Sequence, residues 1–379
     1  MTTLPESKPS QSPADWLKSA AWLFYLAVGL EILFMISPAA LYFYSLYGPA
    51  LNALDHFWAT AWLTQFFLPH ISTTRSLLLN ALPGIGGFLA TVGAVWFLAA
   101  AGQLYWSKFH RRGLVTTGLY GLSRHPQYTG LALFGLGALL LWPRFLVLIA
   151  YVAMLFLYRA LAALEERRCV EAFGEAYRDY QARTRPILPI APESLGVRWV
   201  EIARTRLGRI PALPIVATAL AVVIALGLRE YALTQITAFY ENHSAVLSPA
   251  LLSDRELRSA YRTALADAGV WQAITSTGTA PLVVHVLPQE WYLADLPLDA
   301  EPMSGGHHTP ATFDRRHYKL LFSRARTHEP RAVGKDIIRS AHGLNPFLLA
   351  SVDIAAGTVS IVETPPAYVR WGDIPTPLF

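Results

Sequence analysis

Residues 126–164 read PQYTGLALFGLGALLLWPRFLVLIAYVAMLFLYRALAAL, and this stretch decides the fold of the amino-terminal half. Two apolar segments, 127–142 and 145–164, meet at a Trp-Pro-Arg step over 142–144. Proline interrupts a helical pattern, and Trp together with Arg is typical of a membrane interface. The stretch therefore predicts a helical hairpin in a membrane, with its turn on the far side and both open ends on the cytoplasmic side.

Composition agrees with a membrane protein. Apolar residues make up 53% of the 379 residues and charged residues only 15%, against roughly 25% charged in an average soluble domain. The 11 Trp residues suit anchoring at membrane interfaces. The single cysteine, Cys169, excludes an internal disulfide and any multi-cysteine metal site, and we interpret it as a structural thiol.

Three further apolar runs, 20–47, 77–104 and 211–228, are long enough at about 1.5 Å per residue to cross about 30 Å of hydrocarbon. The first contains Glu31, which we expect to face other helices because an intramembrane charge is costly. Residues 51–70 are aromatic but carry several polar side chains, which favours an interfacial helix over a span. With the hairpin, these runs predict an all-α multispan membrane domain of about five transmembrane helices.

The distribution of charge predicts the sidedness. Residues 105–125 contain four basic residues and no acid, and residues 159–210 contain ten Arg and seven acids. Basic loops beside spans mark the cytoplasmic side, so counting crossings from a cytoplasmic N-terminus places 240–379 on the opposite side. If 51–70 also spans, the N-terminus lies outside instead. Nucleic-acid binding is not expected, because the basic stretches lie between spans rather than on one surface with interleaved aromatics.

The expected organisation has four parts. Residues 1–19 form a polar tail with no apparent cleavable signal peptide. Residues 20–210 form the membrane domain, and residues 211–239 form the last transmembrane helix and a linker. Residues 240–379 form a small soluble α+β domain.

Local patterns predict the elements of this carboxy-terminal domain. Ser253 is a candidate N-cap for a helix over 249–268, with Glu256 three residues further on. Strands are expected at 282–287, 318–324, 348–354 and 358–363, the last two as a hairpin across Gly357.

No catalytic constellation is found in the carboxy-terminal domain. His307 and His308 lie in a Gly-rich loop, with Asp314 and His317 nearby. A metal site needs ligand spacing on a defined scaffold. We therefore interpret these residues as a solvated loop and predict no metal site.

The segment with the clearest chemical character is 113–130, GLVTTGLYGLSRHPQYTG. The residue before a proline is pushed out of the α region, whereas proline itself suits the first helical turn. We therefore expect a helix to begin near Pro126, with His125 on an exposed, non-helical position at its N-terminus. Such an N-terminus offers free backbone N–H groups and partial positive charge, which suit an anion such as a cofactor carboxylate.

Two adjacent acids, Glu165 and Glu166, lie at the cytoplasmic end of the second hairpin helix. Arg159 precedes Glu166 by seven residues and so shares a helix face with it. The acids could hold a cation or the hydroxyls of a ribose. They could equally be a solvated helix end that pairs with Arg167 and Arg168, since such surface pairs are common and weak.

These motifs, in order, carry a resemblance to a known family. L-V-T-T-G-x-Y, R-H-P-x-Y-x-G, a helical hairpin, R-x5-E-E and F-G-x-x-Y-x-x-Y follow one another over about residues 80–189. The set resembles the isoprenylcysteine carboxyl methyltransferase and phospholipid methyltransferase superfamily. That resemblance implies a multispan methyltransferase that binds S-adenosylmethionine in a pocket closed over by its carboxyl-proximal helices.

The same resemblance implies roles for individual residues. Arg159 falls where the family has an arginine implicated in positioning a substrate carboxylate, and Arg159, Glu165 and His125 are the expected catalytic residues. Arg112 stands where the eukaryotic carboxyl methyltransferases carry His, and the loop around 105–111 is shortened, so no contacts are transferred there. The implied cofactor-binding residues are Gly113, Leu114, Val115, Tyr120, His125, Pro126, Tyr128, Glu165 and Glu166.

The predicted reaction is O-methylation of the carboxylate of an isoprenylcysteine-like amphiphile that enters from the bilayer. An anionic nucleophile needs positioning rather than acid–base help; an amine or thiol would need a base, and a glutamate or His125 could serve. A phospholipid N-methyltransferase and a small-thiol S-methyltransferase stay open as alternatives. So does a non-enzyme, a membrane-anchored sensor acting through 240–379, whereas a transporter would need internal repeats that the chain lacks.

Overall fold

The computed structural model describes residues 40–69, 73–111, 113–187, 212–292, 304–305, 312–329 and 331–365. Its contacts divide the chain into two compact units, a helical unit and a sheet unit. The helical unit comprises Met1–Phe34, Pro83–Leu141 and Val147–Val222; the sheet unit comprises Met35–Leu82, Trp142–Leu146 and Val223–Phe379.

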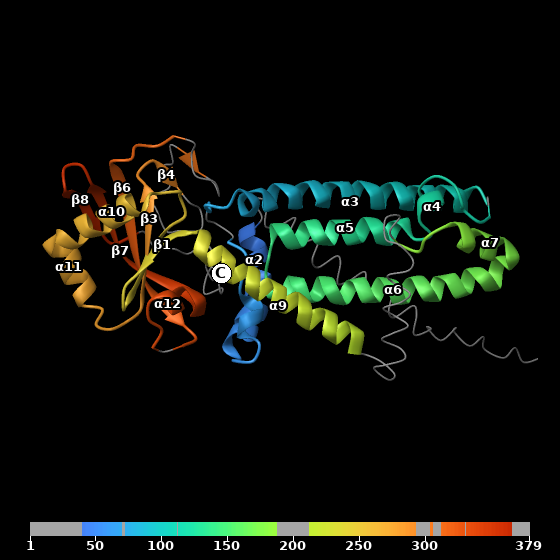
Figure 1. Cartoon of the computed structure of the whole chain (residues 1–379), viewed down its shortest axis with the longest axis horizontal. Helices are drawn as coiled ribbons and strands as arrows, with labels where there is room; N and C mark the ends of the chain where they lie inside the picture. Colours follow the sequence, from blue (N-terminus) through green and yellow to red (C-terminus); the bar gives the residue numbers. More distant parts are fainter. Residues whose placement is uncertain are drawn as a thin grey trace, which may run out of the picture. The chain divides into compact units, whose positions relative to one another are not determined.

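The predicted hairpin is present in the structure. Helix α5 (Pro126–Leu141) and helix α6 (Phe145–Phe173) are joined through residues 142–144, and α5 begins at the proline expected to begin it. The Tyr151 hydroxyl of α6 donates to the Ala132 carbonyl of α5 at 3.1 Å. Helix α3 (Leu77–Phe109) runs alongside α5 (Figure 1).

Glycines let α3 and α5 approach closely. A Cβ atom added to Gly93 would lie 2.6 Å from the Gly130 carbonyl oxygen, and one added to Gly130 would lie 2.7 Å from the Phe97 backbone nitrogen. Gly86 and Gly137 meet in the same way one heptad along each helix. Backbone contact through small residues is a common way for membrane helices to pack.

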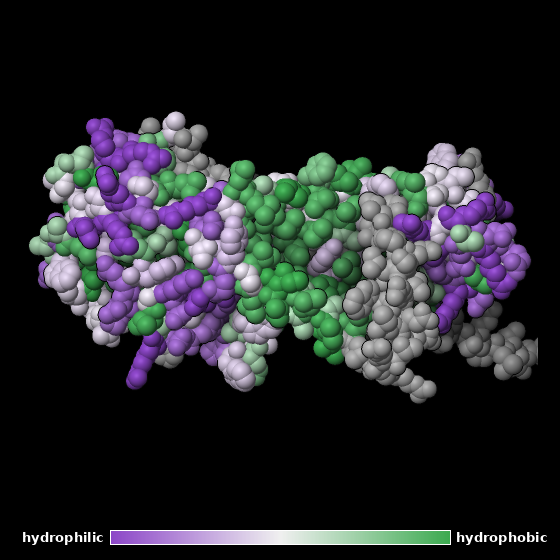
Figure 2. Space-filling view, in the orientation of Figure 1, coloured by the Kyte–Doolittle hydropathy of each residue, from purple (hydrophilic) through white to green (hydrophobic). Residues whose placement is uncertain are grey.

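Three described helices are long and apolar enough to cross a membrane: α3, α6 and α9 (Ala212–Gln235). Only 17%, 39% and 11% of their most apolar windows are buried within the protein. Figure 2 shows hydrophobic side chains covering much of the surface of α3, α5 and α6. An apolar surface of this extent marks contact with a membrane or a partner, and lipid is the natural cover for helices of this length.

The expected count of five spans is not confirmed. Helix α5, at 16 residues, is a shorter apolar helix. Most of the expected span 20–47, with Glu31, lies outside the described residues. Its described end belongs to helix α2 (Ala40–His56), which continues past the expected boundary. The expected interfacial helix over 51–70 is therefore wrong as one element.

After α2 the chain forms a short 3-10 helix, η1 (Ala61–Thr64), and then pairs with the hairpin turn. The Phe67 amide donates to the Pro143 carbonyl at 2.9 Å. Arg144 is fully buried, donates to the Thr64 carbonyl at 2.6 Å and lies 4.5 Å from the centre of the Phe66 ring. This turn arginine is thus buried and held by protein groups, and its place at a membrane interface stays a prediction.

The sheet unit contains a six-stranded mixed sheet with the order β1-β2-β3-β6-β7-β8. Its strands are β1 (Thr237–Tyr240), β2 (Ser244–Ser248), β3 (Leu282–Pro288), β6 (His317–Thr327), β7 (Ala341–Asp353) and β8 (Thr358–Glu363). Among the described strands of this sheet, β2 and β3 alone pair in parallel, and a parallel pair needs a crossover. Helices α10 (Asp254–Ala266) and α11 (Ala268–Thr275) make it. Helix α12 (Lys335–Ser340) joins β6 to β7, and β4 (Trp291–Tyr292) pairs with β5 (Ser304–Gly305).

The α+β prediction for this region is confirmed. Helix α10 has the expected capping box, in which Ser253 and Glu256 satisfy each other's backbone amides. The four expected strands correspond to β3, β6, β7 and β8, with Gly357 at a positive φ of 68° in the hairpin. Strands β1 and β2 and helices α11 and α12 were not predicted. His307 and His308 lie outside the described residues.

Candidate active site

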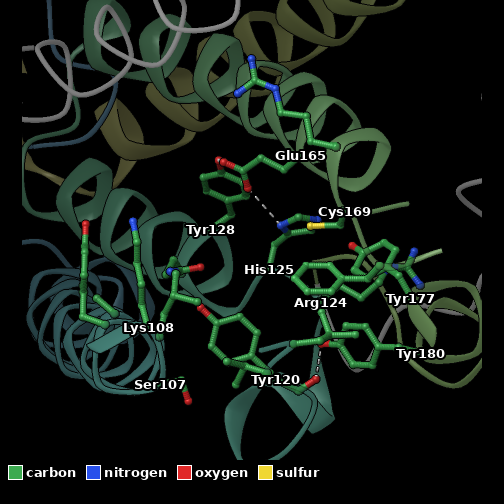
Figure 3. A pocket seen from close by; sticks show the side chains of 18 of the residues that line it. Ser107, Lys108, Tyr120, Arg124, His125, Tyr128, Glu165, Cys169, Tyr177 and Tyr180 are labelled. Atoms are coloured by element: carbon green, nitrogen blue, oxygen red, sulfur yellow. Dashed lines mark hydrogen bonds and ion pairs between the residues drawn. The ribbon is translucent and has the colours of Figure 1, made fainter. Parts of the chain in front are cut away.

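A cavity of about 860 Å³ opens in the helical unit, among the ends of α3, α5 and α6 and the short helices α4 (Leu119–Leu122) and α7 (Glu175–Arg183). Its volume lies in the range of small-molecule sites, roughly 300–1,000 Å³. Its floor and walls are aromatic and aliphatic, with charged side chains at intervals (Figure 3). The lining residues run from Phe97 in α3 to Tyr180 in α7, so the fold brings together segments more than 60 residues apart in the sequence.

The loop before α4 is fastened to α3 by one side chain. Gln103 donates to the Thr117 carbonyl at 2.6 Å and accepts from the Leu119 amide at 3.2 Å. Gly118 has a φ of 63°, and a Cβ atom there would lie 2.8 Å from the Gln103 amide nitrogen. Only glycine fits both the backbone angle and the contact, and this arrangement fixes the loop that carries Tyr120 into the cavity.

His125 is buried rather than exposed. Its side chain is 7% exposed, and its backbone amide donates to the Pro186 carbonyl at 3.0 Å. The neighbouring Arg124 amide donates to the Arg185 carbonyl at 2.8 Å, so the segment after α7 runs along the start of α5. The expectation of an exposed histidine with a free amide is therefore wrong, because a segment 60 residues away covers both.

The two adjacent acids have different partners. Glu165 accepts from the Tyr128 hydroxyl at 3.0 Å, and one of its oxygens lies 3.5 Å from Nδ1 of His125. Glu166 accepts from Nε of Arg124 at 2.9 Å and lies 3.3 Å from Nε2 of His125. Glu165 lines the cavity, whereas Glu166 is turned toward the loop and α7.

An aromatic stack extends the site along α5 and α6. The ring of His125 stacks on Tyr128 with centroids 5.5 Å apart, and Tyr128 stacks on Tyr158 at 5.2 Å. Figure 3 shows Tyr128, His125 and Glu165 turned toward one another at the cavity wall. Stacking between these rings restricts the side-chain rotamers of His125 and Tyr128, which both contact Glu165.

Burial and charge act in opposite directions on His125. Burial alone would lower its pKa, but the hydrogen bonds and negative charges of Glu165 and Glu166 outweigh it and raise the pKa above the ordinary value. Burial raises the pKa of Tyr120, with the Tyr180 and Glu165 side chains adding to the effect. His125 is therefore biased toward its protonated form beside two carboxylates, and Tyr120 stays a neutral donor.

The cavity collects most of the residues that the sequence indicated. Seven of them line it: Gly113, Leu114, Val115, Tyr120, His125, Tyr128 and Glu165. Pro126, the first residue of α5, directly follows His125 in the sequence. Glu166 directly follows the lining residue Glu165 but does not itself line the cavity. Arg159 is exposed on α6 and is not among the lining residues that the structure describes.

Several further residues that line the cavity were given no role in binding a cofactor or substrate from the sequence. Three are cations, Lys108, Arg111 and Arg168, and three are aromatic residues of the F-G-x-x-Y-x-x-Y motif, Phe173, Tyr177 and Tyr180. The motif was the available signal for the aromatic set. The cations carried no signal of their own, because a basic residue near a membrane is usual on the cytoplasmic side.

The lining fits S-adenosylmethionine, the cofactor that the resemblance implies. The buried Tyr120 hydroxyl has no hydrogen-bond partner among the described residues, which is uncommon for a buried polar group unless a ligand supplies one. Glu165 offers an acceptor for hydroxyl or ammonium groups. Lys108, Arg111 and Arg168 offer cations for a carboxylate, and the aliphatic and aromatic walls suit a flat ring system.

Comparisons with known proteins agree with this geometry. Residues 77–176 match the model of the phospholipid methyltransferase family. The chain is also 37% identical over 121 residues to the cobalt-zinc-cadmium resistance protein CzcN of Cupriavidus metallidurans, a match that covers 31% of this chain and 52% of CzcN. The chain thus spans about half the length of this relative. No solved structure matches.

The matched segment contains α3, the α4 loop, the hairpin and the start of α7. Every motif on which the resemblance depends lies in it except the two tyrosines of the F-G-x-x-Y-x-x-Y block, Tyr177 and Tyr180. Residues 77–176 are thus similar to the phospholipid methyltransferase family, in the isoprenylcysteine and phospholipid methyltransferase superfamily that the motifs resemble.

Proposed function

We propose that the chain is an integral-membrane methyltransferase that uses S-adenosylmethionine and acts on a lipid-soluble substrate. One observation carries the proposal: on the wall of a large, mainly apolar cavity, Glu165 accepts a hydrogen bond from Tyr128 and lies within ion-pair distance of His125. The cavity lies at the ends of apolar helices, where a hydrophobic molecule could reach it from the bilayer. The family match over 77–176 supports the reaction class.

The cofactor, when bound, supplies a methyl group activated on a sulfonium. In the proposed arrangement Glu165 and the Tyr120 hydroxyl hold its polar groups, and a lining cation, Lys108 or Arg111, pairs with its carboxylate by a charge-assisted hydrogen bond. Leu114 and Val115, from the loop before α4, cover its apolar part. Pro126 keeps His125 at the start of α5, and Glu166 holds Arg124 so that the loop stays in place.

The protein's contribution to the rate is positioning and exclusion of water. A carboxylate acceptor is already a nucleophile, so holding the two reacting groups in line is the main requirement. Our first-choice acceptor is the carboxylate of an isoprenylcysteine-like amphiphile. Arg159 stays the predicted orienting residue for it, although it is exposed and lies outside the cavity lining, and Arg168 is the rival because it lines the cavity.

A lipid amine is the second candidate acceptor, and the description of the matching family favours it. An ammonium must lose a proton before it can accept a methyl group. Glu165 is the candidate base, since it lies in the cavity and is about one-third exposed. Tyr128 would orient the Glu165 carboxylate through its 3.0 Å hydrogen bond.

The deciding experiment is a methyl-transfer assay with radiolabelled S-adenosylmethionine and protein in lipid nanodiscs. The acceptors are a prenylated cysteine, its methyl ester, phosphatidylethanolamine and a small thiol. Base-labile product from the free acid but not from the ester would identify the carboxylate. Label in the phospholipid would identify the amine. No label in any acceptor, together with no cofactor binding, would overturn the proposal.

Comparison of Arg159→Ala with Arg168→Ala separates the two candidate orienting residues. The variant that loses the orienting cation should show a raised KM for the carboxylate substrate and a smaller change in cofactor affinity. Arg167→Ala, an exposed arginine on the same helix that does not line the cavity, is the matched control.

We further propose that the cavity opens to the cytoplasm and that residues 240–379 lie on the opposite side of the membrane. The single cysteine offers a direct test, because Cys169 lines the cavity. A membrane-impermeant maleimide should label Cys169 in inverted vesicles and not in right-side-out cells, and S-adenosylmethionine should slow the labelling. Labelling from outside would reverse the proposed orientation.

A further inference from the structure

Three potential metal ligands converge within the sheet unit. Asp55 comes from the end of α2, His342 from the start of β7, and His328 directly follows β6. Oδ1 of Asp55 lies 3.2 Å from Nε2 of His328, and Oδ2 lies 2.8 Å from Nδ1 of His342. Ligand atoms of the three residues all lie within 4.8 Å of one another.

The imidazole rings of His328 and His342 are stacked nearly parallel. Their ring centroids are 4.2 Å apart with an interplanar angle of 17°, and each ring turns a nitrogen toward the same carboxylate. The side chains of Asp55, His342 and His328 are 10%, 20% and 29% exposed. The cluster is therefore partly enclosed, with access for a small ion from the His328 side.

A fourth residue supports the carboxylate. The single proton of the Thr64 hydroxyl can be donated to Oδ1 of Asp55, at 3.4 Å, or to the Ala61 carbonyl, at 2.9 Å. Outer hydrogen bonds of this kind orient ligands around protein-bound metals. Here η1, which carries Thr64, packs beside α2, which carries Asp55.

We propose that Asp55, His328 and His342 bind a divalent transition-metal ion, with Zn²⁺ or Co²⁺ as the expected class. Two imidazole nitrogens and one carboxylate are a donor set that suits zinc and its neighbours, and a three-ligand site leaves a position for water or a further ligand. Calcium and magnesium would require more oxygen ligands than the cluster offers. This inference does not depend on the proposed methyltransferase activity, because the residues belong to the other unit.

Another histidine of the same sheet, His317, also lies beside carboxylates, but in a geometry that cannot bind one metal ion. His317 has Asp314 at 2.9 Å from Nδ1 and Asp353 at 3.3 Å from Nε2. These carboxylates contact opposite nitrogens of one ring, so a single ion cannot contact all three groups. His317→Ala is therefore the matched control for removal of a carboxylate-bonded histidine.

The test measures metal binding by the full-length protein in detergent after treatment with a chelator. Co²⁺ is added first, because its visible absorption reports coordination by nitrogen and oxygen, and Zn²⁺ is then added as a competitor. The wild-type protein should bind about one equivalent with a Co²⁺ spectrum of low-coordinate type, and Zn²⁺ should displace it and raise the unfolding temperature.

Variants then locate the site. Asp55→Asn keeps the shape of the side chain and should lower Zn²⁺ affinity by more than about 100-fold, since loss of even an outer hydrogen bond costs about 10- to 100-fold. His342→Ala should do the same, whereas His317→Ala should bind as the wild type does. Stoichiometric binding that is unchanged in Asp55→Asn, or no Co²⁺ spectrum in the wild type, would overturn the proposal and leave a hydrogen-bonded triad.

Discussion

Arg124 and Glu166 form an ion pair that joins the start of α5 to the end of the hairpin: Nε of Arg124 lies 2.9 Å from Oε1 of Glu166, and both side chains are at most 15% exposed. Arg124 also donates from Nη1 to the carbonyls of Gln181 and Thr184, at the end of α7. One guanidinium thus fastens three segments around the cavity. Loss of one member of a shielded pair leaves the other charge without compensation.

Arg124→Ala should therefore destabilise the protein, by about 2–4 kcal/mol. Arg178→Ala is the matched control, because Arg178 pairs with Glu175 where both side chains are mostly exposed. Such surface pairs contribute about 0–1 kcal/mol. Denaturant unfolding in detergent, followed by tryptophan fluorescence, measures both variants. Equal losses in the two variants would mean that the Arg124 network has no special structural role.

Glu165→Gln should weaken S-adenosylmethionine binding by about 10- to 100-fold, because a charged acceptor is worth more than a neutral one. Tyr128→Phe should produce a smaller loss, since it removes only the hydrogen bond that orients Glu165. Glu171→Gln, at an exposed acid six residues further along α6, should bind as the wild type does. Equilibrium binding of labelled cofactor gives all three affinities, and equal affinities for the Glu165 and Glu171 variants would contradict the assignment.

The raised pKa of His125 makes a prediction about pH. A base whose folded-state pKa is raised contributes stability that is fully present below its unfolded-state pKa, about 6.5, and loses it as pH rises through the folded-state pKa. The difference in unfolding temperature between the wild type and His125→Gln should thus be largest near pH 6 and shrink toward pH 9. A difference that stays constant or grows with pH would show that the imidazolium is not what stabilises this site.

Local rules predicted the parts of the fold that are decided locally. The pre-proline step placed the start of α5 at Pro126, and the Ser253 and Glu256 pair placed the start of α10. Both depend on backbone geometry within a few residues. Strand β3 was recognisable because all its residues except His285 are apolar, as is typical of a strand buried on both faces.

Features that depend on distant parts of the chain could not be predicted in this way. His125 is buried because the segment at Pro186 covers it. Arg144 is buried because its guanidinium donates to the Thr64 carbonyl and packs on the Phe66 ring. The short strands β1 and β2 are fixed by pairing along the sheet rather than by their own pattern. The Asp55 cluster joins residues more than 270 positions apart, which no motif spacing indicates.

Because α3 and α5 are in close contact, a glycine-to-alanine substitution should destabilise the protein where the helices touch and not elsewhere on them. Gly130→Ala places a Cβ atom against the Phe97 backbone and should cost about 1–3 kcal/mol through overpacking. Gly102→Ala, on α3, meets no atom within 4 Å and should be neutral or gain about 0.5–1 kcal/mol from helix propensity. Unfolding in detergent distinguishes the two, and equal stability would mean that the helices are not in backbone contact.

The last prediction concerns His285, which is fully buried in β3 and has no hydrogen-bond partner at either ring nitrogen among the described residues. Burial lowers its pKa to about 4. The unfolded chain takes up a proton near pH 6.5, whereas the native state resists it until about pH 4, so stability is present above pH 6.5 and falls between the two values. His285→Leu should unfold with a shallower pH dependence over this interval, whereas exposed His243→Leu should follow the wild type. Parallel pH profiles for the wild type and His285→Leu would mean that the buried ring finds a compensating partner when it is protonated.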